Sequence, residues 1–230
     1  MNKKIKKILN KKNKSKVICL TAYSKNIASI LDKHCDLILV GDSLGSVLYN
    51  FKSTKEVSLD TMINHSKSVR FGVKKSLMVV DMPYNTYKTN SQTLKNAKRI
   101  IIETKCDAVK LEGGKEIINQ IKFLKKNKIS VMGHLGILPQ TVKGKFKSKG
   151  RTVKEKNRLI NDAILLQKNG VFSIVLECVN TSTAKEITNR LKIPTIGIGA
   201  SVNCDGQVLV TDDLIGLNDT KIKFVKRFIN

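Results

Sequence analysis

The sequence lacks several features that would assign it to a class at once. It contains no tryptophan and only three prolines, and no apolar run approaches the ~20 residues that span a bilayer, so we expect no membrane-embedded segment. The five cysteines are scattered and none forms a Cys-x-x-Cys pair, which argues against structural zinc and a disulfide framework. We therefore expect reduced, mostly buried thiols. No Gly-x-Gly-x-x-Gly follows the first expected strand, which weakens a dinucleotide-binding interpretation.

Acidic residues are also scarce: 18 Asp and Glu face 43 Lys and Arg, a formal net charge of +25. Such a charge can indicate a nucleic-acid partner. However, only six of the cations are arginine, the residue whose bidentate fork suits phosphate. Lysine, asparagine and isoleucine enriched together are typical of an AT-rich coding sequence. We therefore predict that most lysines lie on solvated helix faces and that the protein has no nucleic-acid partner. A basic nucleic-acid-binding protein is the alternative, because lysines cluster between Lys3 and Lys16.

The first 16 residues, MNKKIKKILNKKNKSK, have no apolar core and no small-residue cleavage site, so they do not form a secretory signal. We predict a cytoplasmic protein. The length of the whole chain, 230 residues, suits one α/β barrel domain. We divide the chain into a basic N-terminal segment, 1–16, helical or partly disordered, and a single domain, 17–230.

Strand-length apolar runs alternate with helical segments along the chain. The runs lie at 17–23, 37–43, 77–83, 108–114, 129–136, 174–179, 194–200 and 206–212. Near-continuous apolar strands that alternate with helices predict a parallel sheet covered by helices. Eight such units predict a (β/α)8 barrel, with a doubly wound open sheet as the alternative.

Helical periodicity supports the segments between these runs. Residues 115–127 place Ile117, Ile121 and Leu124 on one face, and 94–105 and 153–168 repeat the pattern. A further helix is expected to begin at an N-cap Ser182. The last is expected near 221–229, whereas the link between the seventh and eighth runs is too short for a full helix.

Ionisable side chains follow five successive runs. They are Asp42 with Ser43, Asp81, Lys110 with Glu112, His134, and Glu177. A lone Asp at a strand end is usually a turn or cap residue, but in a barrel these ends form one rim, where active sites lie. Charges inside an apolar strand are also costly unless they are paired. We therefore predict that these residues form one site.

The composition of this group favours a hard metal ion. Asp42, Asp81 and Glu112, without clustered Cys or His, form an all-oxygen set that suits Mg²⁺. A 2-oxo acid offers two further oxygens, and a metal bound to them stabilises an enolate. Lys110 can neutralise the substrate, and Glu177 is free to act as the base.

The remaining histidines and tyrosines carry less information. His134 lies on the predicted rim and is counted among the substrate-binding candidates, although a lone His is often structural. His34 and His65 fall on helix-like segments and are given structural roles. Tyr84 and Tyr87 follow Asp81 and either line a pocket or pack within a loop.

Eight fragments then occur in order along the chain: TAY, LVGDSLG, DMPY, VKLEGG, GHLGILPQ, VLECV, PTIGIGA and CDGQVLV. Together they closely resemble the ketopantoate hydroxymethyltransferase family, from about Val17 to Leu217. The resemblance implies a (β/α)8 TIM barrel of the phosphoenolpyruvate/pyruvate superfamily type. It also implies an enzyme of pantothenate biosynthesis, on the route to coenzyme A. The enzyme would transfer a hydroxymethyl group from 5,10-methylenetetrahydrofolate to 3-methyl-2-oxobutanoate, using Mg²⁺.

The resemblance also assigns roles to residues. It implies metal ligands at Asp42, Asp81 and Glu112, oxo-acid contacts from Ser43 and Lys110 together with both Asp residues, and Glu177 as proton acceptor. The metal-bound oxo acid would lose its C3 proton, and the enolate would attack the folate methylene carbon. Family members form decamers, so we expect a homo-oligomer whose other partners are small-molecule substrates.

Four departures from the family affect loops and folate contacts: Ser24 after TAY, the segment 143–150, Asn180, and Ser201. They leave the predicted catalytic groups in place, which argues against an enzyme that has kept its fold and lost its activity. The remaining alternative is a related-fold Mg²⁺-dependent lyase or mutase acting on another 2-oxo acid. The blocks GHLG and DGQVLV point away from it.

Overall fold

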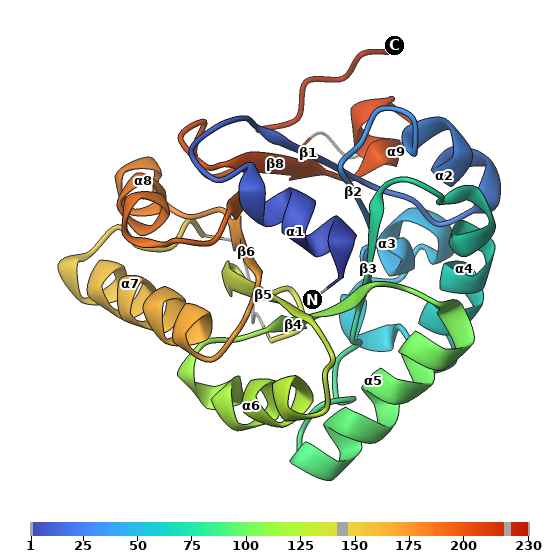
Figure 1. The fold of residues 1–230 in the computed structure, drawn as a ribbon. Coiled ribbons are helices and arrows are strands. Elements are labelled where there is room, and N and C mark those ends of the chain that lie inside the picture. The colour runs from blue at the N-terminus through green and yellow to red at the C-terminus, as the bar shows by residue number, and fades with distance from the viewer. Residues whose placement is uncertain (1, 142–146, 219–221, 230) are drawn as a thin grey trace.

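The chain folds into a closed barrel of eight parallel strands (Figure 1). The computed structural model describes residues 2–141, 147–218 and 222–229. The strands are β1 (Val17–Thr21), β2 (Leu37–Val40), β3 (Leu77–Asp81), β4 (Ala108–Glu112), β5 (Val131–Gly136), β6 (Ser173–Glu177), β7 (Thr195–Ile198) and β8 (Gly206–Leu209). Each strand pairs with the next, and β8 pairs with β1. The predicted (β/α)8 barrel is confirmed, and the open-sheet alternative is wrong.

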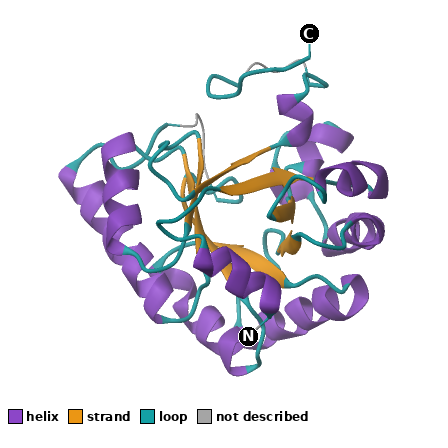
Figure 2. Ribbon diagram, turned by 45° about the horizontal axis from the view of Figure 1, so that its top comes forward, coloured by secondary structure: helices purple, strands orange, loops and turns teal. Residues whose placement is uncertain are grey.

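Helices surround the barrel (Figure 2). They are α1 (Lys3–Asn10), α2 (Lys25–Leu31), α3 (Leu44–Tyr49), α4 (Leu59–Gly72), α5 (Asn90–Thr104), α6 (Ile118–Lys126), α7 (Val153–Lys168), α8 (Thr181–Arg190) and α9 (Thr211–Leu214), with 3-10 turns η1 (Thr54–Glu56) and η2 (Lys115–Ile117). The residues between β7 and β8 contain no helix, as the short link predicts. None of the helices in the described ranges is long and apolar enough to cross a membrane.

Two sequence predictions about helices are wrong. The helix expected near 221–229 is absent from residues 222–229, and residue 221 lies outside the described residues. Ile222, Phe224 and Val225 instead line the cavity at one end of the barrel. Helix α8 begins one residue before Ser182, because the Asn180 side chain accepts a hydrogen bond from the Ser182 N–H (3.1 Å) and so forms the N-cap.

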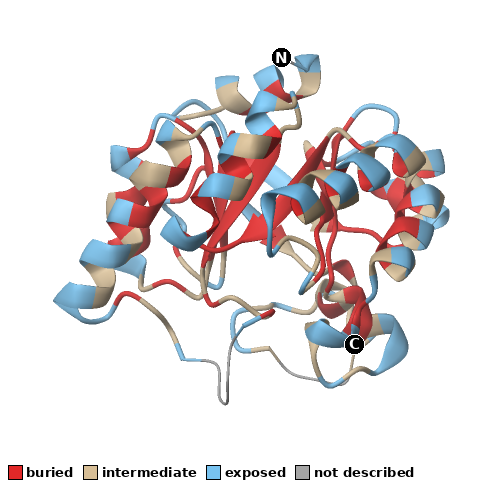
Figure 3. Ribbon diagram, turned by 90° about the horizontal axis from the view of Figure 1, so that it is seen from below, coloured by how far each residue is buried: buried red, intermediate tan, exposed pale blue. Residues whose placement is uncertain are grey.

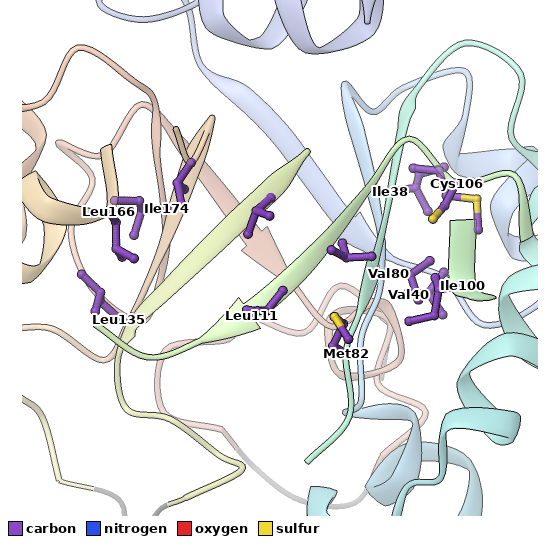
Figure 4. Close-up of a cluster of buried hydrophobic side chains, with 14 of the residues drawn as sticks. Ile38, Val40, Val80, Met82, Ile100, Cys106, Leu111, Leu135, Leu166 and Ile174 are labelled. Atoms are coloured by element: carbon purple, nitrogen blue, oxygen red, sulfur yellow. The ribbon is translucent and has the colours of Figure 1, made fainter. Parts of the chain in front are cut away.

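Most strands are apolar runs because both of their faces are buried, whereas β1 and β8 expose Ile18 and Gln207 on one face. Inward side chains such as Leu39, Val79 and Val175 fill the barrel. Outward ones, such as Val80, pack under helices with Ile100 of α5 (Figure 4). All five cysteines are free thiols, four of them buried, as predicted.

Helix α1 packs against the barrel and buries Ile5 and Ile8, each 1% exposed, in the interior cluster. Figure 1 shows α1 lying across the barrel, and Figure 3 places the two termini at opposite ends of the molecule. Its basic flank is tied down by ion pairs: Lys11 Nζ lies 2.6 Å from Asp36 Oδ2, and Lys12 Nζ lies 2.8 Å from Asp205 Oδ2. Several N-terminal lysines thus serve the fold, while the division at residue 16 and the absence of a nucleic-acid partner stay predictions.

Candidate active site

The predicted site residues all line one cavity of about 900 Å³ at the carboxyl ends of the strands. The cavity is bordered by Asp42, Ser43, Asp81, Lys110, Glu112, His134 and Glu177. Its size is typical of small-molecule sites. Residues 143–146 of the divergent segment 143–150 lie outside the described residues.

Strand register explains why these side chains meet. Lys110 and Glu112 are two residues apart on β4, so both point into the barrel. Lys110 is paired in register with Asp81 of β3, and Glu112 with His134 of β5. Lys110 Nζ consequently lies 3.0 Å from Asp81 Oδ1. The next pair in register is Gly136 with Glu177, which brings β6 into the same rim.

Two glycines allow the strand ends to approach closely. A Cβ at Gly41 would lie 2.9 Å from Ser43 Oγ, so a larger residue there would displace the Ser43 hydroxyl. The turn after β2 lets the Asp42 N–H donate to Asp81 Oδ2 (3.1 Å). Gly136 has φ +103°, and a Cβ there would lie 2.2 Å from the Glu177 carbonyl oxygen.

The buried carboxylates repel one another. Burial raises the pKa of Asp42 to about 8, and the charges of Asp81 and Glu112 act in the same direction. Burial also raises the pKa of Asp81, although Lys110 opposes it. Burial acts on Glu112 too, but the charge of His134 and further hydrogen bonds outweigh it and lower the pKa. This balance favours a further cation beside Asp42.

The two basic groups are held by these acids. Burial lowers the pKa of Lys110, but Asp81, Glu112 and Asp42 outweigh it and raise the pKa above its usual value. Burial and Lys110 likewise lower the pKa of His134, but Glu112 and a contact with Glu177 raise it to about 9. The neighbouring acids thus favour the protonated form of both residues.

His134 lies between the acid that we predict as base and the rest of the cluster. Its Nε2 lies 3.3 Å from Glu177 Oε2, and its Nδ1 lies 3.3 Å from Lys110 Nζ and 3.5 Å from Glu112 Oε1. The imidazole connects the two halves of the site. Contacts on both of its nitrogens fix its position, and its substrate-binding role stays a prediction.

The carboxylate oxygens of the site suit a hard divalent cation that takes further ligands from water or substrate. Within the described part of the chain, no three His, Cys, Asp or Glu side chains are arranged to hold a metal ion by themselves. Mg²⁺ often takes only one or two carboxylates and completes its shell with water and substrate oxygens. In the described residues, buried Glu112 Oε1 and Asp81 Oδ1 have no hydrogen-bond partner. Their contacts are ion pairs, with His134 Nδ1 (3.5 Å) and with Lys110 Nζ (3.0 Å) respectively. These oxygens fit Mg²⁺ that is bound together with a chelating substrate.

Sequence reasoning missed two side chains at the site. Gln140 donates to Asp42 Oδ2 (2.8 Å), and Tyr23 OH lies 2.8 Å from Ser43 Oγ. Both stand in fragments that carry the family resemblance, GHLGILPQ and TAY, which was the available signal. Tyr87, for which two roles were open, contacts Gln140 through its hydroxyl.

Known proteins resemble this chain in sequence along its whole length. A family model described as ketopantoate hydroxymethyltransferase matches residues 2–230. A relative from Pelagibacter ubique (strain HTCC1062), 3-methyl-2-oxobutanoate hydroxymethyltransferase, is 68% identical over 100% of this chain and 89% of its own length.

Solved structures resemble the barrel at low identity. A 2,3-dimethylmalate lyase, a PEP mutase/isocitrate lyase superfamily member, superposes with a TM-score of 0.68 and 9% identity over 94% of this chain and 82% of its own. A phosphonopyruvate hydrolase in complex with oxalate and Mg²⁺ superposes with a TM-score of 0.68 and 8% identity, over 90% of this chain and 80% of its own. At this identity the likeness shows the fold alone.

Proposed function

Because the chain belongs to the ketopantoate hydroxymethyltransferase family, we propose that it transfers a hydroxymethyl group from 5,10-methylenetetrahydrofolate to 3-methyl-2-oxobutanoate. The product is ketopantoate, a precursor of pantothenate. The proposal rests on one observation: four acidic residues to which the family resemblance assigns roles line the same cavity. They are Asp42, Asp81, Glu112 and Glu177.

Asp42, Asp81 and Glu112 are the residues that would hold Mg²⁺. Their buried oxygens and the raised pKa of Asp42 support this assignment, because a divalent cation would relieve the repulsion among them. The chemistry that Mg²⁺ supplies when bound is Lewis-acid polarisation of the 2-oxo group.

Glu177 is the proton acceptor in this proposal. Its carboxylate lines the cavity, is 20% exposed and lies 3.3 Å from His134 Nε2. It takes the C3 proton of the oxo acid, and the electron pair left at C3 forms the new bond to the folate methylene carbon. One methylene carbon–nitrogen bond breaks as this carbon–carbon bond forms, and the other breaks when water adds its oxygen to the methylene carbon. Tetrahydrofolate then leaves, with the C3 proton and one proton of the water on its two freed nitrogens.

The other polar groups bind and orient the oxo acid. Lys110 brings a positive charge to the end of the substrate that carries two oxygens, while Ser43 and His134 offer hydrogen bonds at the rim. The cavity wall is apolar where Leu39, Val175 and Val208 line it, which suits the branched alkyl end of 3-methyl-2-oxobutanoate.

We also propose a cytoplasmic homo-oligomer, a decamer by resemblance to the family. Exposed apolar side chains on neighbouring helices support self-association: Phe71 of α4 is 72% exposed, and Ile30 of α2 is 60% exposed. Sedimentation velocity of the purified protein measures the assembly. A concentration-independent monomer would contradict it.

A direct assay separates this function from the alternative of a lyase or mutase acting on another 2-oxo acid. The purified chain is incubated with 3-methyl-2-oxobutanoate and 5,10-methylenetetrahydrofolate, and ketopantoate is quantified by mass spectrometry. We expect folate-dependent product that EDTA abolishes and added Mg²⁺ restores. Cleavage of another 2-oxo acid without any ketopantoate would favour the alternative.

A further inference from the structure

We propose that Gln140 is a positioning residue, which sets the orientation of the Asp42 and Glu112 carboxylates at the metal site. The inference rests on the proposed function, because it concerns the carboxylates that would hold the cation. Gln140 is 1% exposed and lies four residues beyond the end of β5.

Gln140 makes four hydrogen bonds, and each has a different partner. Its Nε2 donates to Asp42 Oδ2 (2.8 Å) and to the Met82 carbonyl oxygen (2.9 Å). Its backbone N–H donates to Glu112 Oε2 (3.1 Å). Its Oε1 accepts from the Tyr87 hydroxyl (2.5 Å). One residue thus joins the ends of β2, β3 and β4 to the segment after β5.

These partners determine which way the amide points. Asp42 Oδ2 and the Met82 carbonyl are both acceptors, so they need the NH2 group. A flipped amide would place Oε1 against two other oxygens and leave the buried NH2 beside the Tyr87 hydroxyl. Tyr87 therefore supports the donor geometry by holding Oε1 on the opposite side.

The consequence is that each carboxylate has one oxygen held by the chain. Gln140 holds Asp42 Oδ2 and Glu112 Oε2, and the Asp42 N–H holds Asp81 Oδ2. The second oxygen of Glu112 is buried without a hydrogen bond from any described residue. Fixing one oxygen orients the other, and such outer contacts tune metal affinity.

A neutral donor suits this place better than a charged one. A lysine at position 140 would neutralise Asp42 and compete with a metal cation. A glutamate would add a further negative charge beside Asp42. Glutamine keeps the charge of Asp42 available while satisfying one of its buried oxygens.

The test uses the full chain and Mn²⁺ as the probe, with free Mn²⁺ measured by electron paramagnetic resonance. Gln140→Leu removes the side-chain donors and keeps similar volume and the backbone bond to Glu112. Gln167→Leu is the matched control. Among the described residues, the Gln167 side chain bonds only to the backbone of Lys192 and Ile193, just before β7. Tyr87→Phe removes a single hydroxyl and leaves Gln140 in place.

We expect Gln140→Leu to raise the Mn²⁺ Kd about 10- to 100-fold, as loss of outer contacts does at metal sites. Tyr87→Phe should raise it by a smaller factor, and Gln167→Leu should leave it unchanged even if it lowers Tm. In steady-state assays Gln140→Leu should lower kcat at saturating substrate, and raising Mg²⁺ should restore part of the loss.

The possible results separate the inference from its premise. Wild-type protein that makes no complex with Mn²⁺, with or without the oxo acid, would overturn the metal site itself. Wild-type binding with an equal Kd for folded Gln140→Leu would overturn the positioning role and leave the metal site intact. If Gln140→Leu does not fold, Tyr87→Phe decides: an unchanged Kd counts against the inference, and a raised Kd supports it.

Discussion

The packing of α1 against the amino end of the barrel leads to a stability prediction that can be worked out from the structure. Ile8 is 1% exposed and contacts the interior cluster, so Ile8→Ala should leave a cavity there. Replacing a buried isoleucine by alanine costs about 2–5 kcal/mol. For a chain of this length, 1 kcal/mol lowers Tm by about 2–4 °C, so a loss of about 3 kcal/mol lowers it by about 6–12 °C.

Ile102→Ala is the matched control. Ile102 also lies on a helix, α5, but it is 61% exposed, so the same substitution removes little packing. Because alanine is a slightly better helix former than isoleucine, the control also corrects for helix propensity. We expect its free energy of unfolding to change by less than about 0.5 kcal/mol.

The assay is urea and thermal unfolding followed by circular dichroism at one fixed protein concentration. The candidate site lies at the other end of the barrel, so folded Ile8→Ala should exchange the substrate C3 proton at the wild-type rate. Equal losses of stability in Ile8→Ala and Ile102→Ala would refute the reasoning. The N-terminal segment would then not be packed on the barrel in solution.

Three further predictions concern the site and one buried carboxylate. Glu177→Gln should slow C3 proton exchange of 3-methyl-2-oxobutanoate in deuterated water at least ~100-fold with near-normal Mn²⁺ binding, and unchanged exchange would remove Glu177 as the base. Asp81→Asn should lower turnover at limiting Mg²⁺ at least tenfold, about 1.4 kcal/mol, and wild-type rates there would contradict its role as a ligand. Burial raises the pKa of Asp32, but hydrogen bonds from the Ser76, Lys75 and Lys74 N–H groups outweigh it and hold the pKa below the ordinary 3.8. The stabilisation by ionised Asp32 is therefore complete above pH 3.8 and is lost as the pH falls through the lower pKa of the folded state. Asp32→Asn should lower the free energy of unfolding by about 3 kcal/mol at pH 7 and by progressively less in acid. A loss that does not depend on pH would disprove the mechanism.

Periodicity made much of the fold predictable. Most strands are buried on both faces, so they are apolar runs in the sequence. Helices such as α7, Val153–Lys168, have the bounds that their pattern predicts. The α8 cap was missed because two short polar residues, Asn180 and Ser182, compete locally for one position. A helix was wrongly predicted near 221–229 because cavity lining and helix packing both use spaced apolar residues.

The sequence by itself determined that acidic groups gather at one rim, because parallel strands share a direction and residues two apart share a face. Lys110 and Glu112 needed no coordinates to be placed together. The functional roles of these residues remain predictions until they are measured.

Only the tertiary structure decided the contacts between loops and distant segments. Gln140 meets Asp42 across 98 residues of chain, and Lys12 meets Asp205 across 193. No repeat in the sequence encodes such contacts, since they depend on the path that each loop takes once the barrel has closed. Local geometry repeats along the chain and can be read from it, whereas a hydrogen bond between remote side chains exists only after the core has fixed both partners in space.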